Sequence, residues 1–355
     1  MQKAKSASHF LFADALRALA VFAVIILHTA SDYIQHYGEI SNNNWWAADV
    51  YNGLVRFCVP MFVILSGAFL LRPDRIISIK ELLLKRLPKL VIPLICWSII
   101  YILFKTIDYG EPLSSINIKE QLKIFYNGPV AYHLWFLYMM IGVYLAWPVI
   151  NVYIKSATEK NILYFLTLWF LVNSVLGIVN IFTGLETSVE VNIFTGYIGY
   201  FMLGYYLINF TFSKTTLNTI YLLGIAGFAI SIITPYLCFK MGFARTDDII
   251  ATDFTPDVVL CVTALFLWFK NNIKGSGQNI LGKIITQISD CAFGIYLVHI
   301  LVIEYIFSED RNYYENIQGW NPSWAIPVKA LIVLIISYII IKLIKLIPYV
   351  RKIVG

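Results

Sequence analysis

The chain has 355 residues and a formal net charge of +6; 59% of its residues are hydrophobic and only 14% are charged. Ordinary soluble domains carry roughly 25% charged residues, and a water-soluble fold of this length could not hide so much apolar surface. The composition therefore excludes an ordinary soluble protein and predicts an all-α polytopic membrane protein.

Apolar runs of about 20 residues, the length that crosses a bilayer as a helix, recur along the whole sequence. The first run contains two charged residues and is not followed by a small-residue cleavage site, so we expect a retained helix rather than a cleaved signal peptide. We expect a single integral membrane domain over 1–355, with no appended soluble domain. The sequence predicts about ten transmembrane helices, at 10–31, 48–71, 88–107, 133–153, 161–182, 194–212, 217–239, 256–273, 289–308 and 325–347.

The distribution of basic residues predicts the orientation of these helices. Most Lys and Arg residues outside the spans fall in segments that are cytoplasmic if the N-terminus is cytoplasmic. Because basic residues favour that side of a membrane, both termini are predicted to be cytoplasmic, as an even number of spans requires. The basic residues follow the membrane topology, so we expect no nucleic-acid partner.

The five cysteines form no CxxC motif and lie mostly within predicted spans. We expect them to act as small apolar residues rather than as disulfide partners or metal ligands. No group of residues has metal-ligand spacing and no glycine-rich phosphate loop occurs, so no metal site is expected. Arg56 lies inside the second span and needs a partner that the sequence does not name.

The first predicted helix carries ionisable groups on one face. Arg17 and His28 are eleven positions apart, which places them on the same side of a helix and roughly 16 Å apart along its axis. Asp14 precedes Arg17 by three residues, within side-chain reach. Ionisable groups within a span cost about 2.5–3.5 kcal/mol or more and usually face the protein interior or a water-filled cavity.

Two interpretations of this face are open. Asp14 and Arg17 could form an ion pair near the interface while His28 reaches outer water. Alternatively, the face is a polar pathway, with a cation for a ligand phosphate at its inner end and a titratable base further out.

Several blocks resemble the membrane acyltransferase-3 family, in the same order along the chain. DALRALAVFAVIILH (14–28) resembles the signature of its first helix, with an arginine and a histidine separated by ten residues. VPMFVILSGAFLL (59–71), KRLPKLVIP (85–93) and FGIYLVHILVIE (293–304) resemble further blocks. YHLWFLYMMIGVYLAWPVI (132–150) is closer to the branch that contains the enterobacterial common antigen O-acetyltransferase.

The resemblance implies an enzyme of the cytoplasmic (inner) membrane with about ten helices. It implies that an acyl group, usually acetyl, passes from cytoplasmic acetyl-CoA to a hydroxyl of a cell-surface polysaccharide or a lipid-linked sugar. Acyl-CoA, this acceptor and the lipid bilayer are then the expected partners. Acetyl-CoA would be a substrate, and no permanently bound cofactor is expected.

The resemblance also implies roles for individual residues. His28 is expected to be the general base that takes the proton of the acceptor hydroxyl, or to carry the acyl group itself as a variant. Arg17 is expected to bind the acyl donor through its phosphates or near its thioester, because a guanidinium fits phosphate through paired hydrogen bonds. Asp14 would orient Arg17 or form a structural pair with it.

Further residues are expected to bind the acyl donor, each with a structural alternative. Arg72, Arg75 and Arg86 could simply follow the basic bias of the cytoplasmic side, and Ser66 with Gly67 could simply let two helices approach closely. Another group is expected to contact the acceptor or to support the site, although buried or interfacial groups of these types are often structural. Its members are His133, Trp135, Tyr296, His299 and Glu304.

Two other functions fit the same pattern. A transporter or flippase for a glycan or a lipid-linked sugar would use the polar face as a substrate path and would need no acyl-CoA. A non-catalytic membrane scaffold would tolerate apolar residues in place of Arg17 and His28.

Overall fold

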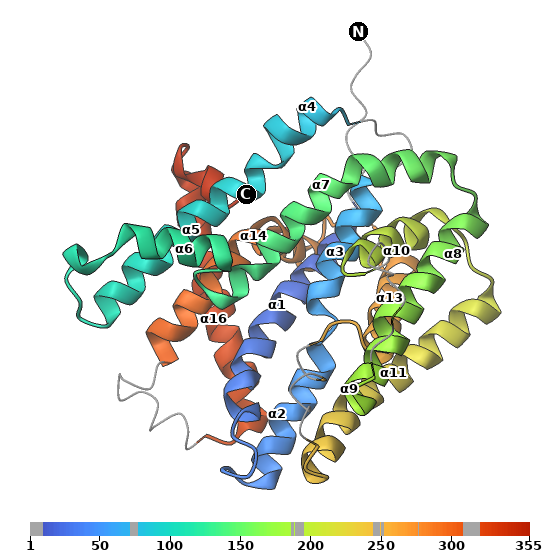
Figure 1. Ribbon diagram of the computed structural model, residues 1–355, viewed down its shortest axis with the longest axis horizontal. Helices are drawn as coiled ribbons and strands as arrows, with labels where there is room; N and C mark the ends of the chain where they lie inside the picture. Colours follow the sequence, from blue (N-terminus) through green and yellow to red (C-terminus); the bar gives the residue numbers. More distant parts are fainter. Residues whose placement is uncertain are drawn as a thin grey trace.

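The computed structural model of the protein describes residues 10–71, 77–185, 188, 195–243, 249, 252–275, 277–307 and 320–355. Over these residues the chain is helical and contains no β-strand, which confirms the all-α class (Figure 1). Several helices begin at polar caps, where a side-chain oxygen accepts a hydrogen bond from a backbone N–H two or three residues further on. These caps are Ser41, Thr158, Ser213 and Asn321.

Among the described residues, eight segments are long and apolar enough to cross a membrane, which agrees with a multi-pass membrane protein. Unbroken helices form four of them: α1 (Leu11–Ile34), α11 (Lys214–Lys240), α14 (Ile280–Phe307) and α16 (Pro322–Leu346). Each of the other four is made of consecutive helices. One combines α2 (Asn42–Val55) with α3 (Cys58–Leu70), and another combines α4 (Ile79–Glu81) and η1 (Leu82–Arg86) with α5 (Pro88–Asp108). The third combines η3 (Tyr132–Leu134) with α7 (Trp135–Ser156), and the fourth combines α8 (Glu159–Phe170) and η4 (Leu171–Val175) with α9 (Leu176–Thr183).

Two of the predicted spans correspond to shorter helices. At 194–212 the structure has α10 (Ile198–Asn209), of 12 residues, and at 256–273 it has α13 (Pro256–Asn272), of 17 residues. Helix α10 packs against α3, and α13 packs against α11. The count of ten spans and the cytoplasmic position of the termini therefore stay predictions.

Helix α1 lies at the centre of the bundle and contacts α2, α3, α13, α14 and α16 (Figure 1). The beginning of α1 and the end of α16 lie at the same end of the bundle. We call this the inner end, after the predicted orientation, and the end at which α1 finishes the outer end. Buried alanines, Ala13, Ala20, Ala23 and Ala30, let the neighbouring helices approach α1 closely.

The contact between α3 and α10 depends on two glycines. A Cβ atom on Gly67 would lie 1.8 Å from the carbonyl oxygen of Phe201, and one on Gly204 would lie 1.9 Å from the carbonyl oxygen of Ile64. Both distances are far below van der Waals contact, so only glycine fits. Gly67 thus serves the close helix packing that was one interpretation of the Ser66–Gly67 pair.

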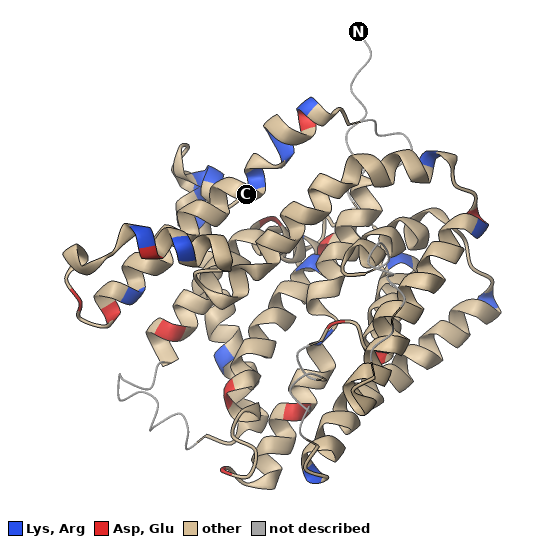
Figure 2. Ribbon diagram, in the orientation of Figure 1, with Lys and Arg blue, Asp and Glu red and all other residues tan. Residues whose placement is uncertain are grey.

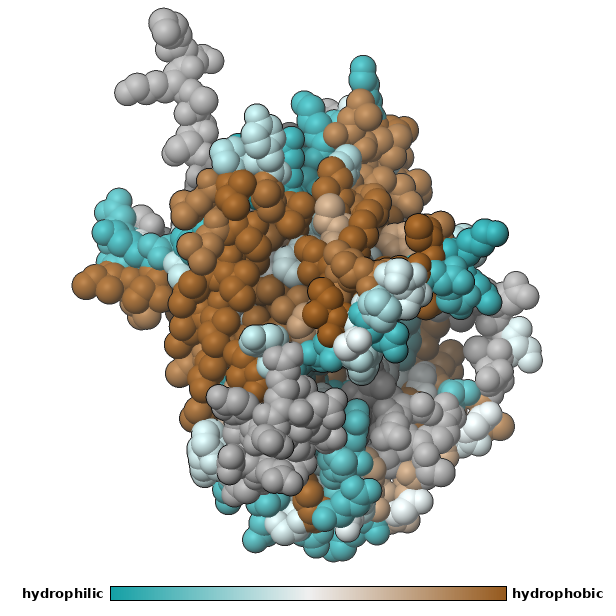
Figure 3. Space-filling view, turned by 90° about the vertical axis from the view of Figure 1, so that its left-hand side faces the viewer, coloured by the Kyte–Doolittle hydropathy of each residue, from teal (hydrophilic) through white to brown (hydrophobic). Residues whose placement is uncertain are grey.

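Charged side chains lie mainly at the ends of the long helices and in the connections between them (Figure 2). Broad stretches of the surface are hydrophobic, as one face of the molecule shows (Figure 3). Large apolar side chains project outward from the middle of long helices, among them Leu222 and Ile225 of α11, each 68% exposed. An exposed apolar surface of this extent indicates contact with lipid.

Arg56 lies at the break between α2 and α3, and the structure supplies the partners that the sequence did not name. Its guanidinium donates hydrogen bonds to the backbone carbonyls of Ile249 and Thr252, the second at 2.7 Å. It also lies 4.0 Å from the carboxylate of Asp257 on α13. The buried cation is therefore satisfied by the connection between α11 and α13.

Candidate active site

Three histidines from separate parts of the chain meet in the outer half of the bundle. His28 lies on α1, His133 in η3 and His299 on α14. The ring centroids of His28 and His299 are 5.2 Å apart, and those of His133 and His299 are 5.3 Å apart. We call these three side chains the histidine cluster. All three were expected at the site from the sequence, and the structure brings them together.

The members of the histidine cluster differ in accessibility. His133 and His299 are buried, at 2% and 0% exposed, whereas His28 is half-buried. His28 is therefore the member that a substrate can reach. Among the described residues, no group of three histidine, cysteine, aspartate or glutamate side chains could hold a metal ion, so the cluster is not arranged as a metal centre.

Hydrogen bonding assigns the proton positions of His299. Its Nδ1 lies 2.6 Å from the carbonyl oxygen of Tyr296, which can only accept, so Nδ1 carries a hydrogen. In the neutral ring Nε2 then holds the lone pair, and this buried nitrogen has no hydrogen-bond partner among the described residues. His299 can therefore accept a hydrogen bond inside the cluster.

Tyrosines from three helical segments frame the histidines. The Tyr132 hydroxyl lies 3.3 Å from Nδ1 of His28, and the two rings pack edge to face. The Tyr101 hydroxyl donates to the carbonyl of Leu297 at 3.0 Å, and its ring packs against His133. Tyr296 donates to the carbonyl oxygen of His133. These contacts fix α5, η3 and α14 around the cluster.

Sequence reasoning missed Tyr101 and Tyr132. Tyr132 directly precedes His133 in a block that resembles the family, so its position was a usable signal. Tyr101 lies in an apolar run of α5 and gives no signal of its own, because only the packing of α5 against α14 brings it to His133.

The inner half of α1 holds a second polar group. A guanidinium nitrogen of Arg17 lies 3.0 Å from a carboxylate oxygen of Asp14, and that same oxygen accepts a hydrogen bond from Ser289 of α14 at 2.8 Å. The guanidinium also lies over the ring of Phe69, 5.5 Å from its centroid. The predicted ion pair is thus present, and the Arg17 side chain is still 37% exposed.

A cavity of about 160 Å³ lies beside Arg17. Arg17 and Ser289 line it together with Phe62, Phe136 and Tyr296. Tyr296 packs with its ring against both His133 and His299. Tyr296 therefore contacts both this cavity and two members of the histidine cluster.

The remaining residues expected to bind the acyl donor lie away from this cavity or outside the described part of the chain. Arg86 forms an ion pair with Glu81 at 3.3 Å and is not part of the cavity wall. The Ser66 hydroxyl donates to the carbonyl of Phe62 in its own helix at 2.8 Å. Arg72 and Arg75 lie outside the described residues.

Two residues expected to support the site lie at its edge. Trp135 packs against Tyr197, with centroids 5.6 Å apart, rather than joining the histidine cluster. Glu304 is half-buried on α14 and interacts electrostatically with Lys105 and Asp108 of α5. Glu304 is thus placed where α5 and α14 meet at the outer end.

Comparison with known proteins identifies the family. A family model described as an acyltransferase domain, that of the acyltransferase-3 family, matches residues 10–342, nearly the whole chain. No curated protein and no solved structure matches the chain. The matched range includes Arg17 and the histidine cluster. The chain therefore belongs to the acyltransferase-3 family and is a membrane acyltransferase.

Proposed function

We propose that this acyltransferase moves an acetyl group from cytoplasmic acetyl-CoA to a hydroxyl of a cell-surface polysaccharide or a lipid-linked sugar, in the cytoplasmic membrane. The observation that carries the proposal is a cavity that the partly exposed Arg17 lines and whose wall residue Tyr296 packs against the histidine cluster. The resemblance of residues 132–150 to the branch with the enterobacterial common antigen O-acetyltransferase supports acetyl as the acyl group.

Arg17 is suited to hold the acyl donor at the inner end. Asp14 fixes one side of its guanidinium, and the exposed side remains available for an anionic group of CoA. The separation of Arg17 and His28 along α1 is about 16 Å, comparable to the length of an extended phosphopantetheine arm. In this arrangement the arm passes through the cavity and delivers the thioester to the histidine cluster.

His28 then acts as the general base. The acceptor hydroxyl loses its proton to the imidazole while its oxygen forms a bond to the thioester carbonyl carbon. The tetrahedral intermediate collapses with cleavage of the carbon–sulfur bond, and the CoA thiolate leaves and takes the proton from His28. The products are the ester and CoA with a free thiol, so no other reactant is needed.

Tyr132 and His299 support this role of His28. The Tyr132 hydroxyl at 3.3 Å from Nδ1 orients the ring. The lone pair on Nε2 of His299, whose ring centroid lies 5.2 Å from that of His28, can accept an N–H of the His28 imidazolium. A neighbour that accepts this hydrogen bond stabilises the charged ring at the moment when the proton is transferred.

The test is transfer of radiolabelled acetyl from acetyl-CoA to membrane glycans. We expect His28→Ala to lower the labelling by roughly 10²-fold or more, the contribution typical of a general base, and Arg17→Ala to lower it at limiting acetyl-CoA. His36→Ala is the matched control, because His36 is an exposed outer histidine that pairs with Glu39. Unchanged labelling in both variants would refute the assignment, and glycan transport without acetyl-CoA would favour a transporter.

A further inference from the structure

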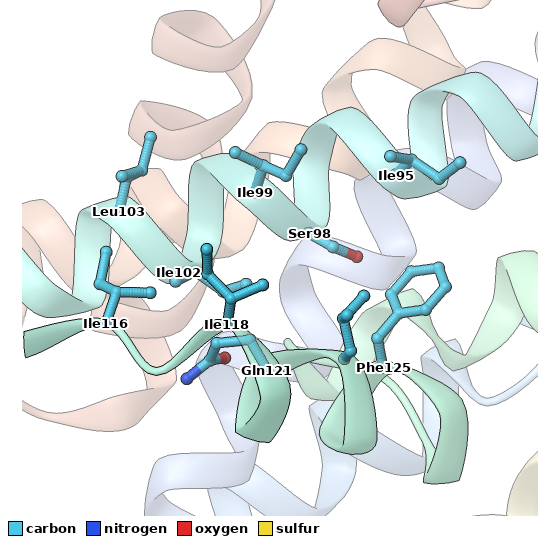
Figure 4. Close-up of a pocket in the computed structure, with 10 residues that line it drawn as sticks. Ile95, Ser98, Ile99, Ile102, Leu103, Ile116, Ile118, Gln121 and Phe125 are labelled. Atoms are coloured by element: carbon cyan, nitrogen blue, oxygen red, sulfur yellow. The ribbon is translucent and has the colours of Figure 1, made fainter.

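An apolar groove of about 460 Å³ runs between α5 and α6 (Ile118–Asn127). Its walls are apolar side chains of the two helices that face one another across the groove (Figure 4). Ile95, Ile99 and Leu103 come from α5, and Ile118, Leu122 and Phe125 come from α6. We call this the α5–α6 groove.

Much of the apolar face of α6 is exposed, although Phe125 packs against Tyr138. Ile118 is 71% exposed and Leu122 is 62% exposed, and no residue of α6 is buried. The helix is nevertheless held in place, since Tyr138 of α7 donates a hydrogen bond to the carbonyl of Phe125 at 2.8 Å. Because apolar surface is stable only away from water, the groove favours a hydrocarbon chain.

Along the chain, each wall of the α5–α6 groove is followed by a tyrosine that contacts the histidine cluster. On α5, Ser98 lines the groove, and Tyr101, one turn further on, packs against His133 with centroids 5.1 Å apart. On the other side, the chain that leaves α6 reaches Tyr132 within five residues of Asn127, and the Tyr132 hydroxyl contacts His28. A chain lying in the groove therefore has its outer end close to the base.

Basic residues stand at the outer end of the groove. Lys105 of α5 follows Leu103 by two residues, is half-buried, and interacts electrostatically with Glu304 and with His133. Lys119 and Lys123 of α6 are exposed. A cation next to an apolar groove suits a ligand that carries an anionic group next to its hydrocarbon chain.

We propose that the α5–α6 groove binds the hydrocarbon chain of the acceptor, a sugar linked through phosphate to a long-chain polyprenol. The phosphate lies near Lys105 and the sugar hydroxyl reaches His28. This inference rests on the proposed function and selects the lipid-linked sugar over a free polysaccharide. A free glycan would leave its hydroxyls unpaired in a groove whose only polar lining residues are Ser98 and Gln121.

The test is photolabelling of the purified full chain by a photoreactive polyprenyl phosphate. Native chain should be labelled on α5 and α6. Ile99→Trp and, independently, Leu122→Trp fill the groove from its two walls, and each should lower labelling by about tenfold or more, because the hydrocarbon chain loses its buried surface. Ile92→Trp is the control, since Ile92 is similarly exposed on α5 (42% against 51% for Ile99) but does not line the groove.

Two outcomes would overturn the proposal. One is native-like labelling of both groove-filling variants at native-like melting temperature. The other is competition by phosphatidylglycerol as effective as that by unlabelled polyprenyl phosphate, which would make the groove an ordinary lipid site. The assay contains no acyl donor, so its failure would leave the proposed acetyl transfer standing, and loss of acetyl transfer would leave the labelling result intact.

Discussion

His28 and His299 lie with their imidazole centroids 5.2 Å apart, although one belongs to the first long helix of the chain and the other to α14. The two rings differ in what they can do. His28 is half-buried and can meet a substrate, whereas His299 is fully buried and its Nε2 has no hydrogen-bond partner among the described residues. This asymmetry makes His28 the candidate base and His299 its candidate support.

The role of His299 can be tested with His299→Asn. The asparagine amide can keep the hydrogen bond to the Tyr296 carbonyl, but it lacks a counterpart of Nε2. We expect a near-native melting temperature, an unchanged KM for acetyl-CoA and a kcat lowered about tenfold or more, as for loss of a group used only in the transition state. An unchanged kcat would show that the Nε2 lone pair is not used.

Tyr132→Phe should lower acetyl transfer without unfolding the protein. The variant removes the hydroxyl that lies 3.3 Å from Nδ1 of His28 and keeps the ring that packs against it. A single neutral hydrogen bond of this kind contributes about 1 kcal/mol, so kcat should fall several-fold. Tyr126→Phe, at a tyrosine that is 88% exposed, is the matched control and should behave like the native chain in the same assay.

Arg17→Lys should weaken binding of acetyl-CoA. Lysine keeps the positive charge but loses the planar fork that pairs with both Asp14 and an anionic ligand. We expect KM for acetyl-CoA to rise about tenfold, with a smaller change in kcat, as measured by initial rates over a range of acetyl-CoA concentrations. A change in kcat alone would argue against a role in binding the acyl donor.

Gly67→Ala should destabilise the bundle. The added Cβ would lie 1.8 Å from the carbonyl oxygen of Phe201, so α3 and α10 would have to separate. Overpacking of this kind costs about 1–3 kcal/mol or more, and the melting temperature in detergent should fall. Gly177→Ala is the control: no atom lies within 4 Å of its added Cβ, so the better helix propensity of alanine should leave stability equal or slightly higher.

Arg56→Met should also lower the melting temperature. Methionine keeps much of the side-chain volume but leaves Asp257 and the carbonyls of Ile249 and Thr252 without the cation. Removal of one partner of a buried ion pair costs about 3–5 kcal/mol. The double variant Arg56→Met with Asp257→Asn should recover part of the loss, and a melting temperature unaffected by Arg56→Met would refute the structural role.

The sequence predicted the positions of the helices better than it predicted their lengths. The position of each long helix was predictable, because a bilayer requires an unbroken apolar run and the runs are visible in the sequence. The helices α10 and α13 were predicted as full spans, yet they have only 12 and 17 residues. Hydropathy locates an apolar run but does not give the length of the helix that the run forms, so the count of spans stays a prediction.

The candidate site could likewise be predicted from the sequence only in part. The spacing of Arg17 and His28 on one face followed from helix periodicity alone, and the family blocks pointed to His133, Tyr296 and His299. Arg86, which is expected to bind the acyl donor, pairs with Glu81 in the structure. The contacts of Arg86 depend on the positions of α4, η1 and α5, and no local sequence pattern predicts those positions.

The sequence by itself thus determined that the protein folds in a lipid bilayer, where most of its long apolar segments lie, and the polar face of α1. These features follow from composition and from periodicity within one helix. Only the tertiary structure decided that Tyr101 and Tyr132 frame the histidines, that Asp257 lies beside Arg56, and that a groove opens between α5 and α6. Contacts between helices are set by the close packing of their side chains, and that packing depends on residues far apart in the chain.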